Sequence, residues 1–367
     1  MSNIVVIGAG IVGASTAYQL SKTNHHVTLI DADFIGRATS AAAGIICPWV
    51  SQRRNKVWYR LASESACYYP KLINELKEQG ISKTGYKQVG TLVVKDDEER
   101  LTNILKLVEQ RRETTPEIGE VHWLDTAETK QRFPLIADGY FSLYVSGGAR
   151  VHGEQLRQAL LLACQKNNVP FITGEASFVD GEIMVSQRKI EADKVVIAAG
   201  AWFNTLVQGL GITGKIKPQK AQITTLQIEA DTEDWPVIMP PGAHYMVPFA
   251  DGRLFAGVTH EDDVGFDTSI TPGGLYQIFS DTFTIAPSLA QSKLIETNVG
   301  FRPVAPDFLP VFGEFPNHPG IYAANGLGSS GLTTGPFIGK QLAQLVLGEK
   351  TDLAVENYPI STILEKG

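Results

Sequence analysis

The sequence contains few cysteines and no long apolar run. Its 367 residues include three cysteines, Cys47, Cys67 and Cys164, whose spacing matches no disulfide framework and no metal-ligand pattern. We therefore expect small buried thiols, no metal site and a soluble cytoplasmic protein. No stretch of about 18 uninterrupted apolar residues occurs, and residues 1–3 lack the basic start of a secretory signal, so we expect no integral membrane segment.

Positive charge is also scarce. Lys and Arg total 32 against 39 Asp and Glu, a net charge of −7, which opposes non-specific binding to nucleic acid or to an anionic membrane surface. A hydrophobic content of 43% excludes general disorder. The length favours two domains, or one large domain with an insert, and needs no disulfide or metal to bury a core.

The first thirty residues form a recognisable unit. The β-branched run Ile4–Ile7 predicts a strand buried on both faces, and a helix is expected to follow as far as about Thr23. A second predicted strand, His26–Ile30, ends at Asp31, which can accept hydrogen bonds from ribose hydroxyls. Between the first strand and the helix lies G-x-G-x-x-G, with Gly8, Gly10 and Gly13.

These glycines suit a dinucleotide. They permit a tight turn, the close approach of a pyrophosphate to the helix N-terminus, and packing of the helix on the strand. We therefore predict dinucleotide binding, and this unit alone leaves NAD and FAD open.

Three later segments are rich in small residues. Residues 36–46 follow the acid and carry one cation, Arg37, suited to close passage beside a second phosphate and a ring edge. A predicted buried strand that starts at Lys194 runs into Ala199, Gly200 and Trp202. Near the C-terminus, residues 320–326 lead into a Gly/Ser turn and a helix expected from about Gly335 to Leu347. The orphan N–H groups at the start of such a helix favour negative charge.

Ordered motifs along nearly the whole chain resemble the FAD-dependent D-amino-acid oxidase (DAO) family, and within it the glycine and sarcosine oxidase branch. Besides the segments above, the matching segments are residues 218–222, 245–248, 257–259, 300–307 and 309–313. The resemblance implies an α/β fold in which a Rossmann-like FAD-binding domain is interleaved with an α+β substrate domain built on an antiparallel sheet. The expected FAD domain comprises residues 1–83, 150–217 and 307–367, and the substrate domain residues 84–149 and 218–306.

Local sequence patterns independently favour strands and helices in both of these domains. Gln88–Val94 and Tyr245–Pro248 read as strands, and Asp97–Arg112 and Leu156–Lys166 have helical periodicity. Asp251-Gly252 predicts a hairpin turn between two apolar runs.

The resemblance also implies non-covalent FAD, with Cys47 not expected to form a flavin link. The C-terminal Gly/Ser loop is expected near the pyrimidine end of the flavin, where backbone N–H groups stabilise negative charge. The residues expected to bind FAD are Gly8, Gly10, Gly13, Asp31, Arg37, Ser40, Ala43, Gly44, Ala199, Gly200, Trp202, Gly326, Gly328, Ser329, Ser330 and Gly331.

Three residues are expected at the substrate. Arg302, in Phe-Arg-Pro, matches a family arginine whose planar guanidinium forks onto the substrate carboxylate. Tyr245 matches a strand tyrosine that assists in substrate binding, and His260 a position that lines the pocket above the flavin. The loop of Leu327, Gly328, Ser329 and Ser330 lacks a second basic residue that the glycine oxidase branch often carries there, which favours a roomier or more polar pocket.

The resulting hypothesis is oxidation of the C–N bond of a small amino acid of the glycine, sarcosine or D-amino-acid type. A hydride would pass from Cα to flavin N5, and the imine would hydrolyse in water. Arg302 would orient the carboxylate, so that positioning dominates and no side-chain base is essential. The electron acceptor, O₂ or a quinone or flavoprotein, and the oligomeric state stay open.

Three alternatives remain. A 2-hydroxy acid dehydrogenase of the same fold would need a base near the hydroxyl, and His260 is its candidate. A non-catalytic flavin-binding subunit would hold FAD that no small acid reduces. Modification of transfer RNA by a related domain is opposed by the acidic charge.

Overall fold

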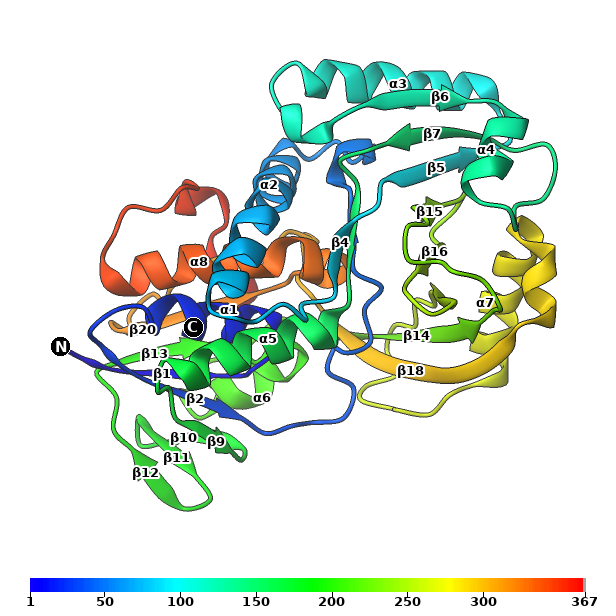
Figure 1. Cartoon of the computed structure of the whole chain (residues 1–367). Helices are drawn as coiled ribbons and strands as arrows, with labels where there is room; N and C mark the ends of the chain where they lie inside the picture. Colours follow the sequence, from blue (N-terminus) through cyan, green and yellow to red (C-terminus); the bar gives the residue numbers. More distant parts are fainter. Residues whose placement is uncertain (366–367) are drawn as a thin grey trace.

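Two large sheets organise the protein (Figure 1). The structure, a computed structural model, describes residues 1–365. The first sheet has six strands in the order β19-β20-β13-β1-β2-β9, and all neighbours run parallel except β19 and β20. Its strands are β1 (Asn3–Ile7), β2 (His26–Asp31), β9 (Phe171–Thr173), β13 (Lys194–Ile197), β19 (Val311–Glu314) and β20 (Ile321–Asn325).

Helices cover this parallel sheet closely. Helix α1 (Ile11–Leu20) is buried over almost its whole circumference, because it packs against the sheet, α5 (Gly153–Lys166) and α8 (Gly331–Leu347). A Cβ at Gly339 would lie 2.6 Å from Cβ of Ser15, so only glycine allows α8 to approach α1 so closely. Helix α2 (Lys56–Glu78) also packs on α8.

The second sheet has eight strands in the order β18-β14-β17-β16-β15-β5-β7-β6. Every neighbouring pair is antiparallel except β5 and β15, which come from distant parts of the chain and run parallel. Its strands are β5 (Thr91–Lys95), β6 (Val121–Leu124), β7 (Phe141–Val145), β14 (Lys217–Gln227), β15 (Val237–Met239), β16 (Tyr245–Pro248), β17 (Arg253–Gly257) and β18 (Lys293–Val304).

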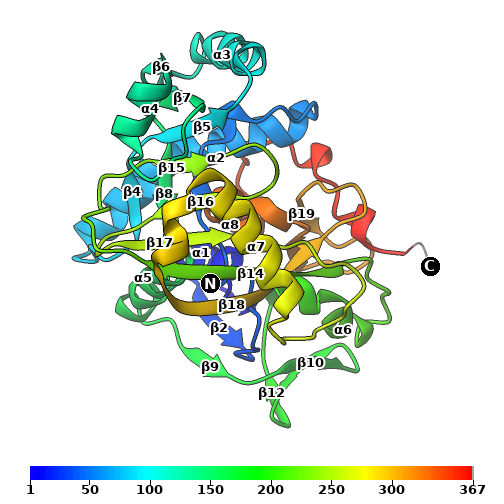
Figure 2. The same ribbon diagram turned by 90° about the vertical axis from the view of Figure 1, so that its right-hand side faces the viewer.

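Helices flank both faces of this sheet. Helix α7 (Pro272–Ile285) lies across β14 and β17, as Figure 2 shows, and Ile278 joins Met246 and Leu254 in the core beneath it. Helices α3 (Glu98–Arg112) and α4 (Thr126–Arg132) lie beside β6 and β7.

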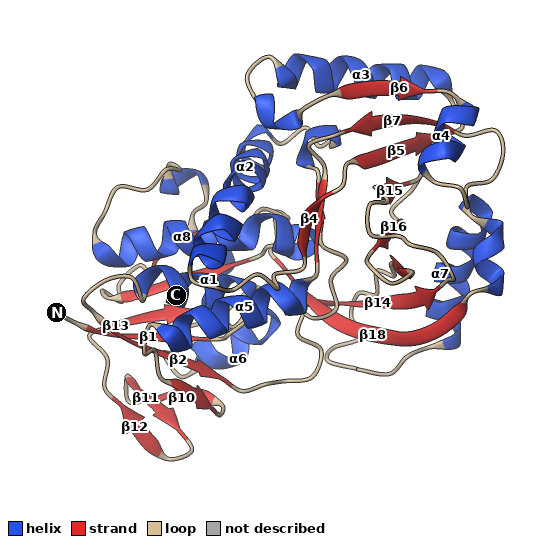
Figure 3. Ribbon diagram, viewed as in Figure 1, coloured by secondary structure: helices blue, strands red, loops and turns tan. Residues whose placement is uncertain are grey.

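The remaining elements are short (Figure 3). One three-stranded sheet consists of β3 (Ile45–Ile46), β8 (Ala149–Val151) and β4 (Tyr86–Gln88), and another of β10 (Ala176–Val179), β11 (Glu182–Val185) and β12 (Arg188–Ile190). Helix α6 (Phe203–Gln208) follows a 3₁₀ turn. Within residues 1–365 no helix is both long enough and apolar enough to cross a membrane.

The predicted α/β fold is confirmed, and two local predictions were wrong. Gln88–Val94 is not one strand, because Gly90 has a φ of +80° and separates β4 from β5. The last helix begins at Gly331 rather than near Gly335. Pro336 in its second turn has no N–H for the carbonyl of Leu332, and the Tyr69 hydroxyl of α2 donates to that carbonyl instead. The domain boundaries stay a prediction.

Candidate active site

One cavity of about 620 Å³ extends between the two sheets. Its wall comes from the β1–α1 turn, the end of β2, residues 37–45, the ends of β13 and β20, the start of α8, and strands β14, β16 and β18. This volume lies in the range of small-molecule and cofactor sites. Elements that are far apart in sequence therefore meet around one site.

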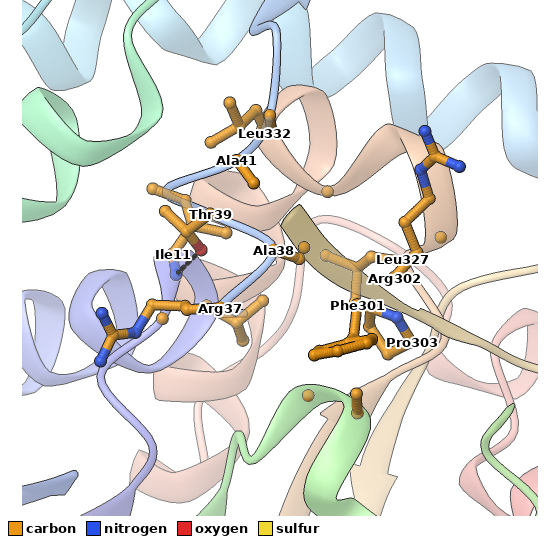
Figure 4. A pocket seen from close by; sticks show the side chains of 18 of the residues that line it. Ile11, Arg37, Ala38, Thr39, Ala41, Phe301, Arg302, Pro303, Leu327 and Leu332 are labelled. Carbon is orange, nitrogen blue, oxygen red and sulfur yellow. Dashed lines mark hydrogen bonds between the residues drawn. The ribbon is translucent and has the colours of Figure 1, made fainter. Parts of the chain in front are cut away.

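The first wall of the cavity is mostly backbone. Gly10 precedes α1 without a side-chain cap among the described residues, and the first turn of α1 carries no acidic side chain. The Ile11 N–H donates to Thr39 Oγ1 at 3.0 Å, which ties residues 37–44 to this turn (Figure 4). The N–H groups at the start of a helix such as α1 are suited to an anion.

Asp31 holds the glycine turn in place. Its Oδ2 accepts from the Ala9 N–H, and its Oδ1 accepts from the Asp33 N–H at 2.8 Å and from Arg37 Nη2 at 2.7 Å. Arg37 Nη2 also lies 2.8 Å from Asp33 Oδ1. The charge of Arg37 is therefore already compensated by two carboxylates, and Asp31 is part of the turn as well as a candidate ribose ligand.

The start of α8 forms a second uncapped helix N-terminus on the cavity. Ser330 provides no side-chain cap within residues 1–365, since its hydroxyl donates to the Leu327 carbonyl, and the first turn has no acidic residue. Gly328 has open space around its missing Cβ. Negative charge would be stabilised here by the helix dipole.

The second wall of the cavity consists of side chains, and Arg302 on β18 is central to it. Figure 4 shows Phe301 and Arg302 leaving the strand on opposite sides. Arg302 Nη1 donates to Gln219 Oε1 at 3.1 Å and to the Thr259 carbonyl at 3.3 Å, and both acceptors are neutral. Gln219 is its cross-strand partner on β14. Burial lowers the pKa of Arg302, although a guanidinium stays protonated at any physiological pH.

Tyr245 and His260 line the same cavity as Arg302. Burial raises the pKa of Tyr245 to about 12, so its hydroxyl is a hydrogen-bond donor rather than a base at neutral pH. Desolvation and the positive charge of Arg302 lower the pKa of His260 below its ordinary value. The imidazole is therefore neutral at pH 7 and can accept a proton.

All but three of the predicted site residues line this cavity. Gly13 lies behind the wall, where a Cβ would be 1.7 Å from the Gly8 carbonyl oxygen. Ser40 faces away and donates to Glu154 at 2.6 Å, and Gly326 packs against Ala305. The residues that line it are Gly8, Gly10, Asp31, Arg37, Ala43, Gly44, Ala199, Gly200, Trp202, Tyr245, His260, Arg302, Gly328, Ser329, Ser330 and Gly331. Their individual roles toward ligands stay predictions.

The cysteines add no metal or redox centre to the part of the chain that the structure describes. Cys47 lines the cavity as a free thiol, and burial raises its pKa to about 12, so it stays protonated. No group of three or more His, Cys, Asp and Glu side chains among residues 1–365 is arranged to hold a metal ion.

Four of the polar or aromatic residues that sequence reasoning missed make contacts that shape the site. Thr39 and Gln219 lie inside segments that were singled out, but their contacts cross 28 and 83 residues of sequence. Arg53 and Trp58 also line the cavity, and nothing in their local sequence indicates this. Alternation along two paired strands is the one signal that could have placed Gln219 beside Arg302.

Comparison with known proteins decides the family. A protein-family model described as "FAD dependent oxidoreductase" (DAO) matches residues 3–345 of the chain. The chain belongs to this DAO family. The uncharacterized oxidoreductase YurR of Bacillus subtilis is 48% identical to it over 98% of both chains. The crystal structure of iminodiacetate oxidase from Chelativorans sp. BNC1 superposes with a TM-score of 0.94 at 39% identity, covering 97% of this chain and 98% of that one. Glycine oxidase of Geobacillus kaustophilus is 26% identical over 98% of this chain and 96% of its own length.

The DAO-family chain is thus an FAD-dependent oxidoreductase, as predicted. Its residues fit the cofactor, because the N-termini of α1 and α8, neither with an acidic residue in its first turn, face one cavity that glycines line. A Cβ at Gly10 would meet nothing closer than Thr39 Oγ1 at 3.5 Å, and Gly200 has no atom within 4 Å of its missing Cβ. The α1 end suits a diphosphate, and the α8 end suits the electron-rich end of the ring.

Proposed function

We propose that the chain oxidises the C–N bond of a small α-amino acid or N-substituted amino acid. The observation that carries the proposal is Arg302, whose guanidinium lies on the cavity with only neutral hydrogen-bond acceptors around it in the described residues. Such a guanidinium matches a carboxylate ligand with two parallel hydrogen bonds. The names of the relatives support an amine: one is an iminodiacetate oxidase and another a glycine oxidase.

The chain's own residues would act mainly by positioning the substrate. Gln219 and the Thr259 carbonyl hold Arg302 Nη1, which leaves Nη2 and Nε to bind the substrate carboxylate. The Tyr245 hydroxyl, protonated at neutral pH, can donate a further hydrogen bond. His260, neutral at pH 7, lines the same cavity and can accept a hydrogen bond from the substrate nitrogen. Bound FAD supplies the acceptor for the two electrons and the hydrogen from Cα, and the resulting imine hydrolyses in water.

A second candidate keeps the fold and changes the substrate to a 2-hydroxy acid. The observation that favours it is the neutral imidazole of His260 on the same cavity as Arg302, since a hydroxyl needs a base. A non-catalytic flavin-binding subunit would not explain why Arg302 is held on the cavity wall.

Anaerobic reduction of the flavin distinguishes these possibilities. We expect glycine, sarcosine, D-alanine or iminodiacetate to bleach the absorbance of the bound FAD, and readmitted air then tests whether O₂ is the acceptor. Bleaching by a 2-hydroxy acid alone would replace the proposal with the second candidate. If neither amines nor 2-hydroxy acids bleach the flavin, the non-catalytic flavin-binding subunit becomes the favoured explanation.

Substitution of Arg302 tests its role directly. Arg302→Met should lower kcat/KM by roughly 10²–10³-fold, because truncation of one partner of a charged pair costs about 2–5 kcal/mol. FAD content should not change, and Arg302→Lys should recover part of the activity. Arg188→Met, an exposed arginine on β12, is the matched control. Unchanged kinetics in Arg302→Met would contradict the proposal.

A further inference from the structure

A second guanidinium borders the same cavity. Arg53 precedes α2, and its Cζ lies 4.6 Å from the centre of the Trp58 ring, at cation–π distance. Its Nη2 donates to the Phe308 carbonyl at 3.3 Å. Trp58 Nε1 in turn lies 3.4 Å from Ser330 Oγ, at the start of α8. Arg53 is solvent-accessible, yet contacts on two sides hold it at the cavity wall.

Arg53 contacts the segment that continues from Arg302. After Arg302 the chain passes through Val304, whose backbone pairs with Leu327, and reaches Phe308, which accepts from Arg53. Leu327 and Ser330 belong to the loop before α8. Arg53 therefore contacts the stretch of chain that follows Arg302, and both arginines line the one cavity.

Among the described residues no acid compensates either of these guanidinium groups. Arg37, the other arginine on the cavity, pairs with Asp31 and Asp33. Within residues 1–365 the hydrogen bonds of Arg53 and Arg302 go only to carbonyl and amide oxygens, and neither forms a salt bridge. In a chain of net charge −7, two such arginines on one cavity leave a local charge that a ligand can neutralise.

We propose that Arg53 is a second carboxylate-binding residue, and that the substrate is a secondary amine with a carboxylate on each side of its nitrogen. Arg302 binds one carboxylate and Arg53 the other. A monocarboxylate would compensate one guanidinium and leave the second uncompensated, whereas a dicarboxylate compensates both. This inference rests on the proposed function for the amine, and it adds no chemical step to it.

Binding of two inert ligands tests the inference independently of turnover. Diglycolate carries two carboxylates around an ether oxygen and cannot form an imine, and ethoxyacetate replaces one of these carboxylates with a methyl group. We expect diglycolate to perturb the flavin spectrum of the FAD-loaded protein at much lower concentration than ethoxyacetate. In Arg53→Met the Kd of diglycolate should rise roughly 10–100-fold, and most of the difference between the two ligands should disappear.

Three further variants control this measurement. Arg53→Lys should restore part of the preference for diglycolate, because it keeps the charge but loses the planar fork. Arg54→Met, an exposed neighbour that does not line the cavity, should leave both Kd values unchanged. Arg302→Met should weaken both ligands.

The outcomes separate the inference from the proposed function. An equal effect of Arg53→Met on both ligands, or no effect on either, would overturn the second carboxylate position. Failure of every amine to reduce the flavin would instead overturn the amine substrate, while a selective loss of diglycolate binding would still show that Arg53 holds a carboxylate.

Discussion

The two walls of the cavity are built in different ways. The wall at the starts of α1 and α8 presents backbone N–H groups and glycine, with few reactive side chains. The opposite wall presents the side chains of Arg302, Tyr245 and His260, carried by β18, by β16 and by the segment after β17. The cofactor wall depends on turns and helix starts, which short stretches of sequence specify. A substrate is selected by side chains that only the completed sheet brings together.

The backbone wall should be the more sensitive to an added side chain. In Gly13→Val the new Cβ would lie 1.7 Å from the Gly8 carbonyl oxygen, so the turn and α1 must move apart. We expect a cost of about 3 kcal/mol or more, which corresponds to an approximately hundredfold or greater loss of FAD affinity or to a failure to fold. The ratio of flavin to protein absorbance, together with a thermal unfolding curve, measures both.

Gly273→Val in α7 is the matched control, because no described atom lies within 4 Å of the missing Cβ at that position. It should leave flavin content and Tm unchanged. A Gly13→Val protein with normal flavin content would show that the turn tolerates displacement, and the contrast between the two walls would disappear.

The same contrast explains how much could be predicted from the sequence. Gly8, Gly10 and Asp31 were identified because strand, turn, helix and acid follow one another within one local unit. Arg302 was placed by resemblance, but the partners that orient it were not predicted, because they lie on other strands. Residue spacing within one strand does not show which other strand pairs with it.

Arg53 and the start of α8 show most clearly what could not be predicted from the sequence. Trp58, which holds Arg53, reaches Ser330 across 272 residues of sequence. The helix appeared to begin late because Pro336 normally disfavours a helix interior, and the compensating hydroxyl of Tyr69 belongs to another helix. In both cases the decisive interaction exists only after the chain has folded.

The side-chain wall should respond to pH through His260. Its pKa lies below the ordinary value of 6.5, so the imidazole is neutral at pH 7 and becomes charged only in more acidic solution. If the substrate is an amine, His260→Gln should lower kcat/KM at pH 8 by less than roughly tenfold, because no base is essential for hydride transfer. If the substrate is a hydroxy acid, loss of the base should cost about 10²–10⁴-fold.

The pH profile supplies the check on that prediction. Where His260 causes the acidic fall of kcat/KM in the native protein, the fall should be absent from His260→Gln. A fall that persists with the same midpoint would assign it to the substrate or to another group.

The smallest effect is expected for the ion pair between Lys220 and Asp267, which lies beside the side-chain wall of the cavity. Lys220, 1% exposed on β14, lies 2.7 Å from Asp267 and 3.7 Å from Glu261, in the segment that contains His260. The hydrogen bond from Lys220 lowers the pKa of Asp267 below its ordinary range. Because the folded-state pKa is depressed, this pair stabilises the fold above about pH 4, and the contribution is lost as the pH falls below that value.

Two substitutions of this pair should therefore differ. Asp267→Asn removes the nearer negative charge and leaves the buried Lys220 with only the more distant carboxylate of Glu261, and we expect Tm at pH 7 to fall by roughly 2–5 °C. Lys220→Met should cost less, because it buries an apolar side chain of similar length while the half-exposed Asp267 returns to water. Flavin content should stay normal in both, since this anchor belongs to the substrate wall. A larger loss of Tm in Lys220→Met would show that the ion pair itself, rather than the avoidance of an unpaired buried charge, stabilises this wall.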